Sequence, residues 1–168
     1  MSRFDPTHCL QVNGSSTDEI LPIVDPVETV KRAPSRLDGS TTFTLALWKL
    51  PPGMRLWDEL PGAWPYEFLQ AIGSREAMII EISSEDASGE LHLYRLDHRA
   101  DSSHSEIVQL NVRGRIERVR ASQLFDSKEA AEVFADYYRN ESVSSRYTLD
   151  QLQSVSYTHL TLPTNREV

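Results

Sequence analysis

Cysteine is almost absent from this chain of 168 residues. Cys9 is its only cysteine, which excludes an internal disulfide and any zinc or iron–sulfur site built from several cysteines. No segment approaches the roughly 20 consecutive apolar residues that a membrane-spanning helix needs. Residues 1–10 also lack the apolar core of a signal peptide. These absences predict a cytoplasmic protein that makes no contact with a membrane.

Glycine and positive charge are also in short supply. The seven glycines form no glycine-rich loop of the kind that cradles phosphates between a strand and a helix. The serines, although frequent, form no Gly-x-Ser-x-Gly elbow. With 17 Lys and Arg against 25 Asp and Glu, the net charge is −8. Such a balance argues against a general nucleic-acid binder and against a basic membrane-binding face.

The length and the 39% hydrophobic content suffice for one globular domain. Residues 1–19 are polar and rich in turn formers, so we expect a loose N-terminal arm. Residues 20–154 then form a single domain. Residues 155–168 resemble the translation of a transposase-type sequencing adapter and are left out of the fold as an artefact. The natural gene is accordingly expected to continue past about Ser154.

Hydrophobic patterning predicts five strands. Residues 41–48 alternate apolar and polar side chains, as a half-buried strand does, and residues 77–82 are apolar on both faces, as in the middle of a covered sheet. The remaining predicted strands are residues 91–96, 106–112 and 115–120, the last two joined by a tight turn at Arg113 and Gly114.

Helical patterns occur at three places. The strongest is residues 126–140, which open on a capping-box sequence and carry apolar residues such as Phe134 at helical spacing. Shorter helices are expected within residues 20–32, capped by Asp25, and at residues 66–72. The strands in a meander, followed by one long helix, predict an α+β fold: an antiparallel sheet of about five strands with helix 126–140 packed on it.

The side chains that could carry chemistry form no recognisable constellation. Cys9 adjoins His8, but both fall in the predicted arm, where nothing would hold a nucleophile and its base together. His92, His98 and His104 have carboxylates nearby, yet their spacing matches no known zinc site. We therefore expect no catalytic, cofactor-binding or metal-binding residues, and no enzyme.

Charge is distributed unevenly along the chain. Residues 76–106 carry eight acidic residues against two arginines, a net −6, whereas residues 113–120 carry four arginines against one glutamate, a net +3. A clustered acidic surface suits docking to a basic partner; the alternative is that charged hairpin tips simply block edge-to-edge aggregation. The candidate partner-binding carboxylates are Glu81, Glu85, Asp86, Glu90, Asp97 and Asp101.

Two of the three tryptophans, Trp57 and Trp64, lie among prolines close to Tyr66. Aromatic side chains in such a segment anchor protein partners or line ligand pockets. They also serve as core that plugs one end of a sheet. Trp57 and Trp64 are therefore added to the candidate partner-binding residues.

The last third of the chain carries a composite pattern: a strand, a glycine turn, a second strand, a helix that opens Glu-Ala-Ala, and a short extended tail. The segments concerned are residues 110–115, 119–131, 134–139 and 147–149. This pattern resembles the C-terminal half of the first immunity-protein family of bacterial polymorphic toxin systems, and small actinobacterial proteins of unknown function. The resemblance implies a small cytoplasmic protein that binds and neutralises a cognate toxin and needs no catalytic residues.

Three functions remain open from the sequence. The first is a non-catalytic protein-binding module, most concretely an immunity protein that faces a basic toxin domain. The second is an accessory or regulatory protein with some other partner. The third is a small-molecule binder or enzyme that uses a pocket between Trp57 and Tyr66. The sequence does not define an oligomeric state.

Overall fold

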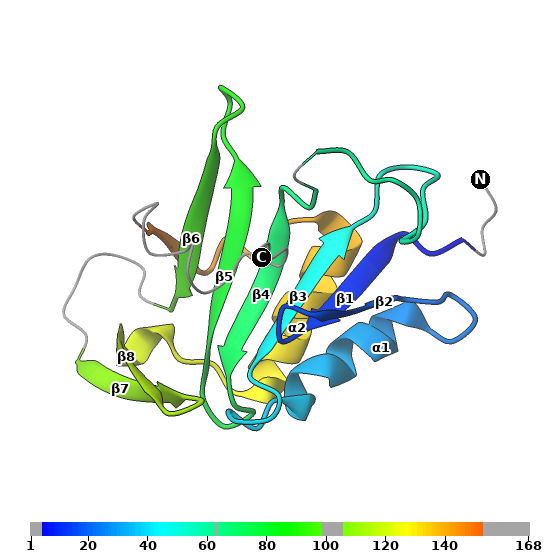
Figure 1. Ribbon diagram of the computed structural model, residues 1–168. Helices are drawn as coiled ribbons and strands as arrows, with labels where there is room; N and C mark the ends of the chain where they lie inside the picture. The colour runs from blue at the N-terminus through cyan, green and yellow to red at the C-terminus, as the bar shows by residue number, and fades with distance from the viewer. Residues whose placement is uncertain (1–4, 63, 99–105, 153–168) are drawn as a thin grey trace.

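The computed structural model describes residues 5–62, 64–98 and 106–152 (Figure 1). Within them, seven strands form one antiparallel sheet in the order β2-β1-β3-β4-β5-β6-β9, and β7 and β8 form a separate two-stranded sheet. The strands are β1 (His8–Val12), β2 (Ser16–Glu19), β3 (Thr44–Lys49), β4 (Phe68–Gly73), β5 (Met78–Glu85), β6 (Leu91–Asp97), β7 (Ile107–Val112), β8 (Arg115–Arg120) and β9 (Thr148–Gln151).

Helices α1 (Pro26–Arg32) and α2 (Ser127–Asn140) cover one face of the large sheet, called here the inner face (Figure 1). The β7–β8 hairpin lies against the opposite, outer face. Short 3-10 turns, η1 (Ala33–Arg36) and η2 (Ala121–Gln123), complete the described elements. The α+β prediction is confirmed, although the main sheet has seven strands rather than about five, and two of the predicted strands, β7 and β8, lie outside it. Neither described helix is long and apolar enough to span a membrane.

Helix α2 forms where the sequence predicts it. The Asp126 carboxylate accepts a hydrogen bond from the backbone N–H of Glu129 at 2.9 Å and so caps the first turn. The helix ends at Asn140, because Glu141 adopts a left-handed conformation at φ 58°. Its buried stripe, which includes Val133 and Phe134, packs on the apolar inner face of the sheet.

The central strands are buried on both faces. Alternate residues of β3, β4 and β5 point inward to the helices; among them are Leu47, Leu69 and Ile80. On the outer face, Trp48 of β3 packs with Phe68 of β4 in a second apolar cluster. The prediction for β5 is therefore confirmed, whereas β3 is buried more completely than a half-buried strand.

The prediction of a loose arm at residues 1–19 is wrong for the part that the structure describes. His8–Val12 is a sheet strand that pairs with both β2 and β3. The polar residues that suggested an arm make the turn between β1 and β2, in which the Asn13 side chain accepts a hydrogen bond from Phe43 N–H at 2.9 Å. The others lie in β2, an edge strand that needs no apolar face on its solvent side.

The predicted short helix at residues 66–72 is wrong: from Phe68 onward these residues belong to strand β4. The spacing of the apolar residues in this segment is compatible with both a helix and a strand. Hydrogen-bonded pairing with β3 on one side and β5 on the other makes it strand β4. Gly73 does not end a helix; it makes the close turn into β5 at φ 138°, where a Cβ atom would lie 2.5 Å from the carbonyl oxygen of Ala77.

The other predicted local signals are largely confirmed. Asp25 caps α1 by accepting a hydrogen bond from Val27 N–H at 3.1 Å, and Pro26 is the first helical residue, so that helix begins later than residue 20. Arg113 and Gly114 both have positive φ, as a two-residue hairpin turn requires. The adapter-like residues 155–168 lie outside the described residues.

The packing of α2 can be tested at Phe134, whose side chain is fully buried. Phe134→Ala is expected to lower the free energy of unfolding by about 3–5 kcal/mol, because it leaves a cavity between helix and sheet. Urea denaturation measures this loss. Lys128→Ala, at an exposed position of the same helix, is the control and should change stability by less than about 0.5 kcal/mol. A loss below about 1 kcal/mol for Phe134→Ala would contradict the packing.

His8 predicts a dependence of stability on pH. Its ring is buried on the inner face at 4.4 Å from that of Tyr138, and burial lowers its pKa to about 4. In the unfolded chain a histidine has a pKa of about 6.5. Between about pH 6.5 and pH 4 the unfolded chain therefore binds a proton at His8, whereas the folded chain does not. Stability through this group is therefore complete above about pH 6.5 and decreases as the pH falls towards 4, by up to about 3 kcal/mol.

The measurement is a set of urea titrations from pH 7 to pH 4 on the wild type and on His8→Gln, whose side chain does not titrate. The difference in unfolding free energy between the two proteins should shrink as the pH falls, because only the wild type carries the histidine penalty. Parallel curves over this range would show that His8 is not buried in its neutral form.

Candidate functional site

Three segments meet at one end of the large sheet, called here the acidic end: the β3–β4 connection, the β5–β6 hairpin and the last turn of α2 (Figure 1). The hairpin projects beyond the neighbouring strands. The Asp86 carboxylate shapes its turn by accepting hydrogen bonds from Ser88 and from the backbone N–H of Glu90. Hydrogen bonds from the Ser88 hydroxyl and from His92 hold the pKa of Asp86 well below its usual range, so this carboxylate is negative.

The acidic end presents many carboxylates and few available cations. Its exposed acidic residues are Asp58, Glu59, Glu67, Glu85, Asp86, Glu90 and Glu141. The cations of the β3–β4 connection and its flank are already engaged: Lys49 Nζ lies 2.6 Å from Glu141, and Arg55 Nη2 lies 2.8 Å from Glu19. The surface therefore carries net negative charge on hydrogen-bonded, ordered segments.

The two candidate tryptophans differ in their surroundings. Trp64 is half-buried; its Nε1–H donates to the carbonyl oxygen of Lys49 at 3.1 Å, and its ring meets Tyr66 edge-on at 5.1 Å. Trp57 is 72% exposed, with the Arg55 guanidinium 4.3 Å from its ring centroid. Trp64 thus serves partly as core, whereas Trp57 is displayed to solvent.

A cavity of about 240 Å³ lies beside Trp64 at this end. The side chains around it combine three aromatic rings, three carboxylates and one lysine: Trp64, Tyr66, Tyr137, Glu67, Glu85, Glu141 and Lys49. The segment between Trp57 and Tyr66 therefore both plugs the end of the sheet and forms a pocket wall.

Two predicted partner-binding residues are buried and do not belong to the surface. Glu81 is 1% exposed and Asp97 fully buried, because both lie on the outer face of strands that are covered on that side. Charge alone does not report the face on which a strand residue lies. Glu85, Asp86 and Glu90 are exposed at the acidic end as predicted. Asp101 lies outside the described residues.

Glu81 is part of a cross-strand line of polar side chains on the outer face, called here the polar row. The strand register places Gln70 opposite Glu81, and Glu81 opposite Arg95. Gln70 Nε2 donates to one carboxylate oxygen of Glu81 at 3.0 Å, and Arg95 donates to the other from Nη2 at 2.7 Å and from Nε at 3.0 Å. On the next strand, β9, Asp150 lies opposite Arg95 in the register. The Asp150 carboxylate forms an ion pair with Arg120 of β8 at 3.0 Å.

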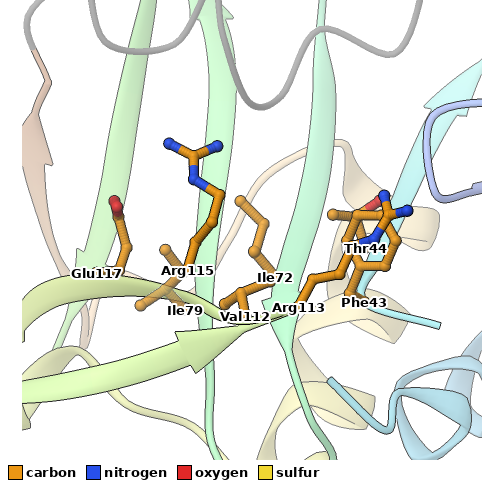
Figure 2. A pocket seen from close by; sticks show the side chains of 8 residues that line it. All are labelled: Phe43, Thr44, Ile72, Ile79, Val112, Arg113, Arg115 and Glu117. Carbon is orange, nitrogen blue, oxygen red and sulfur yellow. The ribbon is translucent and has the colours of Figure 1, made fainter. Parts of the chain in front are cut away.

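The other end of the large sheet holds a smaller cavity of about 170 Å³ on its outer face (Figure 2). Its floor is Ile72 and Ile79 on the large sheet, and Arg113, Arg115 and Glu117 of the β7–β8 hairpin segment rise beside it. No pattern described above for the sequence predicted this cavity. The alternation along β8 does point to it. Arg115 and Glu117 lie on the same face of the strand as the buried Val119, and this face is turned towards the large sheet.

The residues considered for catalysis do not converge. Strand β1 places His8 on the inner face and Cys9 on the outer face, so these neighbours cannot act as a base and its nucleophile. Burial raises the pKa of Cys9 to about 12, which keeps the thiol protonated.

The histidines considered for metal binding are engaged in hydrogen bonds. His98 uses both ring nitrogens, with the carbonyl oxygen of Ser122 at 2.7 Å and with Glu129 at 2.8 Å. His92 contacts Asp86 at 2.8 Å, and Glu90 lies nearby at 3.8 Å. This trio belongs to the hairpin turn itself. His104 lies outside the described residues.

No family model, no curated protein and no solved structure matches this chain. The resemblance to immunity proteins stays a prediction, and the geometry at the two ends of the sheet is what bears on function.

The structural role of the Glu81–Arg95 pair can be tested apart from any partner. Arg95→Met leaves a carboxylate buried without its cation and is expected to lower the free energy of unfolding by about 3–5 kcal/mol. Chemical denaturation measures the free energy of unfolding of the wild type, of Arg95→Met and of the double variant Glu81→Gln/Arg95→Met. The double variant should recover much of the loss, because it removes the buried charge. Arg118→Met, at an exposed position of β8, is the control; a cost for Arg95→Met as small as that of the control would contradict the role.

Proposed function

We propose that this protein is a non-catalytic protein-binding module of the cytoplasm, most concretely an immunity protein that binds and neutralises a basic toxin domain. The observation that carries this proposal is the acidic end. It gathers exposed carboxylates from separate segments onto one ordered surface, where they outnumber the described cations: Lys49 pairs with Glu141 alone, and Arg55 is taken up by Glu19.

The charges of the acidic end act mainly on encounter and orientation. A surface of one sign attracts a partner of the opposite sign before contact and rejects partners of like charge. The projecting β5–β6 hairpin brings Glu85, Asp86 and Glu90 to the most accessible part of that surface. A toxin domain that acts on nucleic acid has a basic active site. The acidic end would bind over that active site and block it.

Affinity needs an apolar anchor as well as charge, because exposed ion pairs contribute little net binding energy. Trp57 supplies one on the β3–β4 connection, where its ring is exposed and has the Arg55 guanidinium over one face. Tryptophan and arginine are the residue types most enriched among interface hot spots.

Two other functions use the same region. An accessory or regulatory protein with a different basic partner would need the same charged surface, and only the identity of the partner separates it from an immunity protein. The cavity beside Trp64 favours a third function, the binding of a small cation, since aromatic rings and carboxylates surround it. A thermal-shift screen with small organic cations tests that function directly.

The immunity function predicts an effect of charge reversal at the acidic end. The double variant Glu85→Lys/Glu90→Lys should weaken binding to the cognate toxin domain, sought in the gene directly upstream, by about tenfold or more, chiefly through slower association. The measurements are association kinetics at low and at high salt, and the growth of cells that express the toxin domain with wild type or variant.

The matched control is Glu76→Lys/Glu106→Lys, which changes the net charge by the same amount at exposed positions away from the acidic end. Its binding and protection should equal those of the wild type. Equal loss in both double variants would show that total charge matters rather than this surface. A wild-type chain that neither binds the upstream toxin domain nor protects cells from it contradicts the immunity function.

A further inference from the structure

The cavity under the β7–β8 hairpin combines an apolar interior with a cationic mouth. Its apolar lining comes from both sheets and from the residue before β3: Ile72, Ile79, Val112 and Phe43. Two arginines stand beside this lining, and Glu117 is the one carboxylate among the residues that line the cavity. The local balance is therefore positive, opposite to that of the acidic end.

The two arginines of the cavity are not used in ion pairs among the described residues. The Arg113 guanidinium lies over the Phe43 ring, 4.9 Å from its centroid. No described carboxylate lies within ion-pair distance of Arg115, whose guanidinium extends from the hairpin along the sheet (Figure 2). Glu117 instead approaches Arg95 of the polar row, at 3.9 Å.

The position of Arg115 in its strand makes this arrangement unusual. Residues that alternate along β7 and β8 towards the large sheet include the buried Leu110 and Val119. Arg115 occupies the same side of β8, where an apolar residue would extend the packing. A guanidinium placed there brings five hydrogen-bond donors to the edge of an apolar cavity.

The size of the cavity limits its occupant. A volume of about 170 Å³ is close to that of an apolar cavity of roughly 150 Å³ that holds one benzene molecule. An arginine at the mouth recognises a carboxylate through paired N–H donors. We propose that this cavity binds a carboxylate attached to a single ring or branched aliphatic group, with the apolar part between Ile72 and Ile79 and the carboxylate at Arg115.

Two sources offer this chemistry: a free aromatic acid, and the C-terminal residue of a peptide. The proposal is independent of the protein-binding function, because the cavity and the acidic end lie at opposite ends of the large sheet. Binding here would survive loss of the toxin partner, and loss of the cavity would leave the acidic end intact.

The test uses the whole chain and four probes: benzoate, its uncharged analogue benzamide, a short peptide that ends in phenylalanine with a free carboxylate, and the same peptide amidated. Titrations followed by NMR shifts of the Ile72 and Ile79 methyl groups report occupancy of the cavity. Benzoate should bind at least tenfold more tightly than benzamide. A stronger response to the free-carboxylate peptide than to benzoate identifies a peptide C-terminus as the source, and the reverse order identifies a free acid.

Arg115→Gln should weaken carboxylate binding at least tenfold and leave the weak binding of benzamide unchanged. The matched control is Arg118→Gln, an exposed arginine three residues along the same strand that does not line this cavity. It should bind as the wild type does. Absence of binding by both carboxylate probes, equal binding of benzoate and benzamide, or an unchanged affinity in Arg115→Gln would each overturn the proposal.

Discussion

A carboxylate buried at the centre of the sheet constrains most of what surrounds it. Glu81 is 1% exposed in strand β5, and a charge so placed is tolerated only with partners on both sides. Gln70 on β4 and Arg95 on β6 supply them. A slip of one residue would turn Glu81 to the helix side, among Ile80 and Ile82. The pair thus fixes the register of three adjacent strands.

That register determines where the two candidate sites lie. Strand β5 begins beside the cavity with Ile79 and ends at the acidic end with Glu85. The polar row crosses the outer face between them and separates the apolar cluster around Phe68 from the one beneath the hairpin. Opposite charge at the two ends therefore follows from one strand alignment: carboxylates at the β5–β6 turn, and arginines on the β7–β8 hairpin.

The sequence predicted the elements whose signals are local. Helix 126–140 has its cap, its apolar stripe and its end in adjacent residues, and residues 77–82 are apolar enough to require a central strand. The failures concern residues whose state depends on distant partners. Residues 66–72 fit a helix or a strand until β3 and β5 flank them. Strand β1 looks like an arm because its partner β3 comes more than 30 residues later.

Of the acidic end, the sequence predicted the residues that lie in one hairpin. Glu85, Asp86 and Glu90 flank a turn, and a turn exposes its side chains whatever the fold. Glu81 and Asp97 have the same charge but lie within paired strands, where exposure depends on what covers the sheet. The cavity needs Phe43, Ile72 and Arg115 from three distant segments, and no local pattern joins them.

The same geometry bears on whether the two ends influence each other. Energetic coupling between distant sites needs an element with two alternative arrangements that both ligands bias. The path from Ile79 to Glu85 is one continuous strand, paired with β4 as far as Ser83 and with β6 from Glu81 onward, and held in register by the buried Glu81–Arg95 contact. A strand fixed in this way has a single arrangement, since a register shift would bury the charge of Glu81 against the helices. A carboxylate in the cavity and a basic protein at the acidic end should therefore bind additively.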